Sequence, residues 1–268
     1  CPIISYSPST VVDTVNMAAT HSVVSTGGPI TGCSVTTGTL PAGFSINSSC
    51  QVSGTATGTF SATSVVVTAT NASGSDTANL TLSAVVARPV ISYSPSTVVD
   101  TVGKSASHGI VSTGGGVVVY HIAPALPSGL TLDTVTGAIS GTPSATSTAA
   151  NYVVTGTNAS GSDTAGLTLS VVVARPIISY SPSTVVDTVN MAATHSVVST
   201  GGPITGCTVT TGTLPAGFSI NSSCQVSGTA TGTFSATSVV VTATNASGSD
   251  TANRSEEHTS ELQSHLNL

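Results

Sequence analysis

One segment occurs three times in this chain at a fixed spacing. Its copies begin at Pro2, Pro89 and Pro176, so both intervals are 87 residues (89 − 2 and 176 − 89). A second segment, TNASGSDTA, follows the same period. Solenoid repeats usually have about 20 to 50 residues, so a longer period is more typical of an independent β-sandwich domain. The sequence therefore predicts three copies of one module.

The period divides the chain into modules at 1–87, 88–174 and 175–253. Copies 1 and 3 are nearly identical, because Ser34 against Thr208 is the only difference over their shared length. These two copies therefore count as one observation. Copy 2 is the single independent comparison.

The composition favours an all-β fold. Only 5% of the residues are charged and 3% are aromatic, while Val and Thr, which favour pleated strands, are abundant. No stretch has a sustained helical period. The strand signals of copy 2 are short and alternate with turns, which predicts seven or eight strands. They cover residues 92–99, 107–113, 117–123, 130–133, 138–142, 151–158 and 164–173.

Copy 2 contains four short motifs in order: LPSGL, TG, ISGTP and TNASG. In combination they resemble the immunoglobulin-like repeat of large bacterial surface and secreted proteins, which is related to the dystroglycan-type cadherin-like domain. The resemblance covers all three copies, although copies 1 and 3 have LPAGF and VSGTA in place of LPSGL and ISGTP. It implies tandem Ig-like or cadherin-like β-sandwiches, an extracellular position, and a spacer or adhesive role. Some relatives bind calcium.

Four cysteines occur as column pairs. Cys33 and Cys50 in copy 1 correspond to Cys207 and Cys224 in copy 3, and both columns lack cysteine in copy 2, which has Tyr120 and Gly137 there. Joint presence and joint absence predict the disulfides Cys33–Cys50 and Cys207–Cys224, and hence an oxidising compartment. The alternative is a pair of reduced, buried cysteines. Zinc is disfavoured because no copy has four ligands at zinc spacing.

The chain lacks the residue patterns of a catalytic site. No two of the seven acids before residue 254 lie within three residues of each other, and neither a Gly-x-Ser-x-Gly motif nor a phosphate loop occurs. His21, His108 and His195 share one column. We expect these to be surface or partly buried strand histidines without an acidic partner, and we expect no enzyme activity. The alternative is that they are metal ligands or catalytic bases.

Calcium is the one metal to consider. Asp76 and Asp163 lie in the last loop of a module, and Asp100 and Asp187 lie near the start of the next one. Carboxylates of neighbouring modules could meet at a junction, but two lone Asp residues make a weak site. We therefore expect no cofactor and keep these four as weak calcium candidates.

The loop asparagines Asn71, Asn158 and Asn245 each begin an Asn-Ala-Ser sequon in a predicted exposed loop. A eukaryotic secretory pathway could glycosylate them. In a bacterial protein they would serve as turn residues, which is the favoured interpretation.

The sequence changes abruptly after Asn253, where copy 1 continues with the apolar strand LTLSAVVA but copy 3 has RSEEHTSELQSHLNL. The string RSEEHTSELQSH resembles the conceptual translation of a sequencing adapter. We expect residues 254–268 to be an artefactual tail and repeat 3 to lack its last strand. The alternative is a genuine polar C-terminus.

Together these features predict a non-catalytic spacer or adhesive region of a larger cell-surface or secreted bacterial protein, of which this chain is an internal fragment. Neighbouring repeats are the expected partners, with surface proteins or glycans as further candidates. The alternative is a calcium-dependent adhesion module or a glycan- or protein-binding module. The net charge of −6 and the four scattered basic residues disfavour nucleic acid. No apolar run approaches the ~20 residues of a membrane span.

Overall fold

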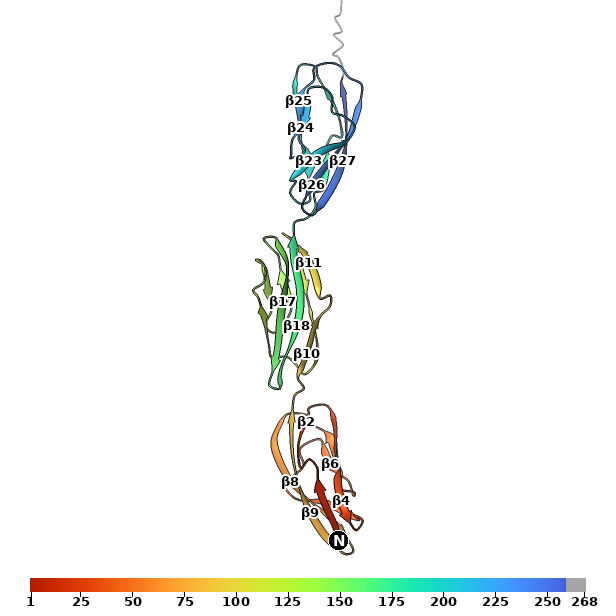
Figure 1. Ribbon diagram of the computed structural model, residues 1–268, viewed down its shortest axis with the longest axis vertical. Helices are drawn as coiled ribbons and strands as arrows, with labels where there is room; N and C mark the ends of the chain where they lie inside the picture. Colours follow the sequence, from red (N-terminus) through yellow and green to blue (C-terminus); the bar gives the residue numbers. More distant parts are fainter. Residues whose placement is uncertain (259–268) are drawn as a thin grey trace, which may run out of the picture.

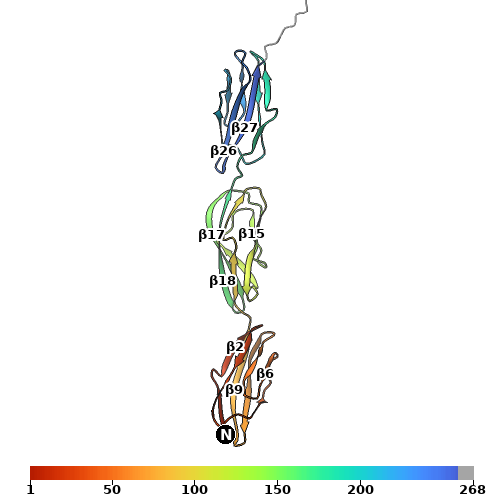
Figure 2. The same cartoon turned by 90° about the vertical axis from the view of Figure 1, so that its right-hand side faces the viewer.

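A computed structural model describes residues 1–258, which form twenty-seven β-strands. The strands make three modules that follow one another along a single long axis in both views (Figure 1, Figure 2). The predicted all-β class and the tandem arrangement of three modules are confirmed. No helix within the described residues is long and apolar enough to cross a membrane.

Each module has nine strands in the same order along the chain. In module 1 they are β1 (Pro2–Tyr6), β2 (Thr10–Thr14), β3 (Ala18–His21), β4 (Val23–Gly27), β5 (Gly32–Thr37), β6 (Phe44–Ile46), β7 (Val52–Thr55), β8 (Phe60–Asn71) and β9 (Gly74–Val85). In module 2 they are β10 (Pro89–Tyr93), β11 (Thr97–Thr101), β12 (Ala106–His108), β13 (Ile110–Gly114), β14 (Val119–Ala123), β15 (Leu130–Leu132), β16 (Ile139–Gly141), β17 (Ser147–Asn158) and β18 (Gly161–Val172). In module 3 they are β19 (Ile178–Tyr180), β20 (Thr184–Asp187), β21 (Ala192–His195), β22 (Val197–Ser199), β23 (Gly206–Thr211), β24 (Phe218–Ile220), β25 (Val226–Thr229), β26 (Thr237–Asn245) and β27 (Gly248–His258).

The strands of a module form two layers. In module 1 one layer is the four-stranded sheet β2-β9-β8-β5, in which β2 runs parallel to β9 and the other pairs are antiparallel. The other layer contains the pair β1-β4 and the sheet β3-β7-β6. Modules 2 and 3 repeat this topology.

Alternating burial along the long strands places the core between the layers, because successive side chains of a strand point to opposite faces. In β9, for example, Leu80 and Leu82 are fully buried. Tyr6 lies opposite them on β1, and its hydroxyl donates a 2.6 Å hydrogen bond to the carbonyl of Cys50. Tyr93 and Tyr180 repeat this bond in the other modules.

The number of strands differs from the expectation of seven or eight. The predicted strand 92–99 is divided into β10 and β11, with the cis peptide Ser94–Pro95 between them. Proline has no N–H for a ladder hydrogen bond, so pairing stops there. The predicted strand 107–113 is divided at Gly109, where the chain passes from one sheet to the other.

The expectation that repeat 3 lacks its last strand is wrong. Strand β27 continues through residues 254–258 to His258, and it pairs with β26 and β20. The physical reason is that a ladder is made by backbone groups, which these residues supply as well as the apolar sequence of copy 1 does. Residues 259–268 of the predicted tail lie outside the described residues.

Candidate functional site

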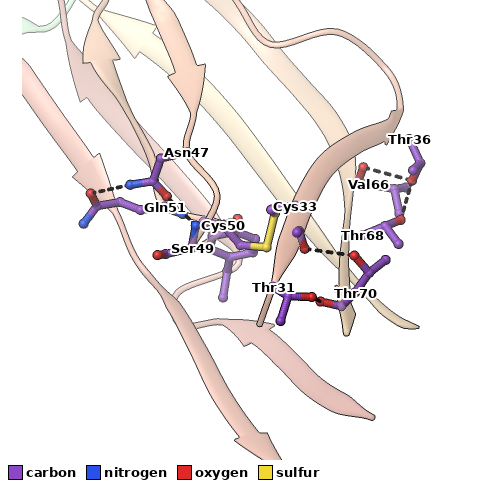
Figure 3. Close-up of a disulfide and its surroundings, with 12 residues drawn as sticks. Thr31, Cys33, Thr36, Asn47, Ser49, Cys50, Gln51, Val66, Thr68 and Thr70 are labelled. Carbon is purple, nitrogen blue, oxygen red and sulfur yellow. Dashed lines mark hydrogen bonds between the residues drawn. A yellow bond between two sulfur atoms is a disulfide. The ribbon is translucent and has the colours of Figure 1, made fainter. Parts of the chain in front are cut away.

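The predicted cysteine pairs are brought together in modules 1 and 3. Cys33 in β5 bonds to Cys50 in the turn before β7, and their Cα atoms are 5.3 Å apart. The pair Cys207–Cys224 has the same Cα separation. Figure 3 shows the first bridge beside Asn47, whose Oδ1 accepts hydrogen bonds from the backbone of Ser49 and Gln51. Each bridge therefore ties the four-stranded sheet to the opposite layer.

Module 2 fills the same space with an aromatic ring. Tyr120 is 4% exposed, and a Cβ built on Gly137 would lie 2.9 Å from Cε1 of that ring. Gly137 has a φ of 74°, and Cys50 and Cys224 also have positive φ at this position. Tyr120 and Gly137 are thus a matched substitution for the disulfide, since the ring needs the space that a side chain at position 137 would occupy.

Three side chains donate hydrogen bonds at the junction between modules 1 and 2. The linker consists of residues 86–88, between β9 and β10. The side-chain amide of Asn158, in the β17–β18 hairpin, donates 2.7 Å to the carbonyl of Ala87 and 3.1 Å to that of Gly116. The hydroxyl of Ser160 donates 2.6 Å to the carbonyl of Val86.

The linker also contacts the hairpin through its own side chain. Nη2 of Arg88 donates 2.8 Å to the carbonyl of Ser162, and the carbonyl of Arg88 accepts from the N–H of Gly115. The three linker residues are therefore all hydrogen-bonded to module 2. We call this arrangement the linker clasp, defined by Asn158, Ser160 and Arg88.

The junction between modules 2 and 3 keeps the asparagine of the clasp. Asn245 donates 2.7 Å to the carbonyl of Ala174 and 3.0 Å to that of Pro203. The arginine contact is longer, because Nη1 of Arg175 lies 3.4 Å from the carbonyl of Ser249. Asn71, the same column in module 1, donates to Pro29.

The clasp gives the TNASG motif its role. Asn158 is only 8% exposed, so its predicted place in an exposed loop is wrong for this copy. All three asparagines also accept the backbone N–H two residues later, as turn asparagines do.

The sequence matches the Putative Ig domain family over residues 2–86, 88–173 and 175–259. The chain belongs to this family.

Several solved structures of immunoglobulin domains are similar to the chain at low sequence identity. No curated protein sequence matches it. Extracellular domains 3–5 of Drosophila OTK are 11% identical with a TM-score of 0.38, and the match covers 94% of each chain. The insect immune protein hemolin is 14% identical with a TM-score of 0.44, and the match covers 93% of this chain and 73% of that chain. Sidekick-1 immunoglobulin domains 1–4 are 15% identical with a TM-score of 0.34, and the match covers 94% of this chain and 73% of that chain.

Each Putative Ig domain of the chain holds an Asp–His pair that the sequence did not predict. Nε2 of His21 lies 3.0 Å from Oδ2 of Asp13, and both side chains are mostly buried. Asp100–His108 and Asp187–His195 repeat the pair. The expectation that these histidines lack an acidic partner is therefore wrong. The only available signal was an eight-residue spacing shared by all copies.

The Asp–His pair connects the layers, because Asp13 lies in β2 and His21 in β3. The ring of His21 stacks on Phe44 with centroids 6.3 Å apart. A carboxylate that accepts from a histidine ring can orient a catalytic base, but this pair is enclosed by packing. Its evident role is to satisfy two buried polar groups across the sandwich.

The calcium candidates are not brought together. Oδ2 of Asp163 accepts the N–H of Ile91 near the start of β18, and Asp76 accepts that of Ile4 in the same way. Asp100 pairs in register with Val171, at the other end of β18. Eight residues of extended chain separate the two ends of that strand, which is about 26 Å. Asp187 is bonded to His195, and no group of three or more possible metal ligands occurs in residues 1–258.

Backbone hydrogen bonds hold the pKa of Asp163 below its ordinary value. The N–H of Ile91 has the largest effect, followed by that of Thr164, and Arg88 adds a favourable charge. This carboxylate is therefore a structural acceptor between the first and last strands of its module.

A cavity flanks each of the two linkers. The cavity at the first junction has a volume of about 360 Å³ and lies between Val15–Met17 of module 1 and Gly114–Gly116 of module 2. The cavity at the second junction, about 350 Å³, has Lys104 and Arg175 among its lining residues. Apolar and glycine residues make up most of both linings, so neither cavity resembles a catalytic cleft.

Proposed function

We propose that this chain is a non-catalytic spacer, a row of rigid Ig-like modules that separates other parts of a larger protein. The observation that carries the proposal is the linker clasp. A free three-residue linker would let two modules swing, but here Asn158, Ser160 and Arg88 hydrogen-bond the linker to the module that follows it.

The sequence of each linker adds to this restraint. Pro89 and Pro176 follow the linker arginines, and proline has a fixed φ and restricts the residue before it to extended conformations. Neighbouring repeats of the same chain are thus the first partners of each module.

We place the parent protein outside the cell or on a bacterial cell surface. Two disulfides support an oxidising compartment. The motif resemblance to bacterial surface repeats, including their dystroglycan-type relatives, supports the same position.

An adhesive role is the second candidate, and one repeated feature favours it. The outward side of each β1–β4 type sheet carries two exposed aliphatic residues. All six are between 46% and 60% exposed. The pairs are Ile3 with Val24, Val90 with Val111, and Ile177 with Val198. A surface protein could dock on such pairs. A glycan would find few exposed aromatic rings to stack on.

We propose that the array needs no calcium. The supporting observation is that the carboxylates of Asp76 and Asp163 are used within their own modules. Calorimetry with calcium alone should show no heat of binding; a saturable isotherm would favour the calcium-dependent alternative.

We also propose that residues 254–268 are foreign to the module, as their resemblance to a translated adapter suggests. Support comes from the core of module 3. There Arg254 and Glu256 occupy positions that hold buried leucines in the other copies.

Small-angle X-ray scattering tests the spacer proposal. Modules 1 and 2 have strands of 12 residues, about 40 Å long, and the longest strand of module 3 has 11 residues, so three modules in a row give a rod of about 120 Å. A rod of that length has a radius of gyration of about 35 Å, whereas a compact protein of this size has about 18 Å. A value near the smaller figure would refute the proposal.

A further inference from the structure

The last strand of module 3 places two charged side chains inside the sandwich. Arg254 and Glu256 occupy the columns of Leu80 and Leu82, which lie two periods of 87 residues earlier. They are 1% and 0% exposed, and both leucines are fully buried. Two ionisable groups therefore replace apolar groups in the core.

Arg254 and Glu256 satisfy each other's hydrogen-bonding groups only in part. Nε of Arg254 donates 2.6 Å to Oε1 of Glu256, and the guanidinium carbon lies 5.0 Å from the centre of the Tyr180 ring. Nη2 of Arg254 and Oε2 of Glu256 have no hydrogen-bond partner within residues 1–258. A buried ion pair with unsatisfied atoms is commonly less stable than apolar side chains of similar volume.

The neighbouring strand β26 does not pair with the end of β27. In module 1 the strand β8 starts at Phe60, which pairs with Ala84 near the end of β9. Its counterpart β26 starts three positions later, and its pairing ends with Thr237 opposite Glu256. The end of β27 is thus held mainly by β20, from Thr184 opposite Ser255 onward.

We propose that the position held by residues 254–258, between β20 and β26, is a binding site for an extended peptide with aliphatic residues at alternate positions. The peptide runs parallel to β20 and displaces the attached segment. Its backbone forms the same ladder, because strand addition depends on main-chain hydrogen bonds. The buried positions that Arg254 and Glu256 now occupy would select its side chains.

The fitting pattern is present in the chain itself. In β9, Leu80, Leu82 and Ala84 point inward, and Thr81 and Ser83 lie between them on the outer face. A peptide with this pattern would place its two leucines on Tyr180 and Val239, which belong to the core of module 3. Arg254 and Glu256 would then return to water. The attached segment is covalently linked to module 3, which favours it over a free peptide. Displacement therefore depends on the free energy gained when two leucines are buried in place of Arg254 and Glu256.

Fluorescence anisotropy of a labelled peptide with the sequence of residues 79–87 tests the site on the full chain. We expect saturable binding to the unaltered chain. Binding to the double variant R254L/E256L should be at least about tenfold weaker, because its attached strand has regained the leucines of modules 1 and 2. The matched control peptide carries L80R and L82E and should not bind.

Hydrogen exchange locates the bound peptide. With peptide present, the amides of residues 254–256 should exchange faster, whereas those of β20 should stay protected. Two results would overturn the proposal: no saturable binding up to the solubility limit of the peptide, or equal affinity for the unaltered chain and R254L/E256L. Circular dichroism of the double variant shows that it is folded before the comparison is made.

Discussion

The side-chain amide of Asn158 donates a 2.7 Å hydrogen bond to the carbonyl of Ala87, in the linker that precedes its own module. The two residues are 71 positions apart, and the same bond recurs between Asn245 and Ala174. A motif that looks like a surface turn in the sequence therefore bonds modules 2 and 3 to the linker that precedes each of them.

Replacing Asn158 by alanine should loosen the first junction. The carbonyls of Ala87 and Gly116 would lose their donor, at a cost of about 1–3 kcal/mol for partly buried groups. Residual dipolar couplings would report it: modules 1 and 2 should share one alignment tensor in the unaltered chain and have different tensors in N158A. The control is N71A, which removes the bond to Pro29 and should leave this junction unchanged. A common tensor in N158A would contradict the role of the clasp.

Reduction of the disulfides should destabilise modules 1 and 3 but not module 2. A bridge that closes 17 residues contributes roughly 3 kcal/mol in the chain-entropy model. Hydrogen exchange with mass spectrometry, with and without reductant, resolves the three modules. Module 2 is the internal control because Tyr120 fills its space. Equal losses of protection in all three modules would refute the assignment.

Converting the buried ion pair to leucines should stabilise module 3. We expect R254L/E256L to raise its free energy of unfolding by about 1–4 kcal/mol, the range found when apolar residues replace buried ion pairs. The single variant R254L should lower it by about 3–5 kcal/mol, because the charge of Glu256 remains buried without a partner. Chemical denaturation followed by module-resolved hydrogen exchange measures both. A double variant less stable than the parent would contradict the assignment.

Alkaline pH should destabilise module 2 through Tyr93. Burial raises the pKa of Tyr93 to about 12, and Tyr120 adds to the effect. In the unfolded chain the pKa is about 10. The stabilisation is fully present below pH 10 and is lost as the pH rises toward 12, because the unfolded state releases its proton first. Y93F should make the free energy of unfolding of module 2 less dependent on pH over this window, although it also loses the bond to Gly137. An unchanged slope in Y93F would exclude Tyr93 as the source.

Acidic pH should weaken the attachment of the first strand in module 2. Because the bond from Ile91 lowers the pKa of Asp163, the contribution of this carboxylate is present above the unfolded pKa of about 3.9 and is lost as the pH falls through the folded value. D163N keeps an oxygen acceptor but does not titrate. Acidification should therefore reduce the exchange protection of the Ile91 amide in the parent but not in D163N. The same acid response in D163N and the parent would contradict this origin.

Much of the fold could be predicted from the sequence because it repeats. The period of 87 residues located the modules, and alternation of Val and Thr with turn residues located most strands. The joint absence of two cysteines in copy 2 indicated which cysteines pair, since Tyr120 and Gly137 replace both partners together. Each of these signals lies within one column or one strand.

What could not be predicted depends on contacts between distant strands. Asp13 and His21 lie on different sheets, so their contact follows from the packing of the layers and not from spacing alone. Asn158 looked like a turn residue because its second bonding partner lies 71 residues earlier. Composition also misled at residues 254–258, where backbone pairing overrides unsuitable side chains.

The parallel pairing of β11 with β18 has a mechanical consequence. Strand β11 lies near the start of module 2, and β18 leads directly into the next linker. If a flow or a moving cell pulled the array along its axis, these neighbouring strands would be drawn in opposite directions along their length. Their hydrogen bonds, which lie across the pull, would then share the load and would have to break together and not one at a time. The same strand arrangement in every module would let the array bear tension without lengthening.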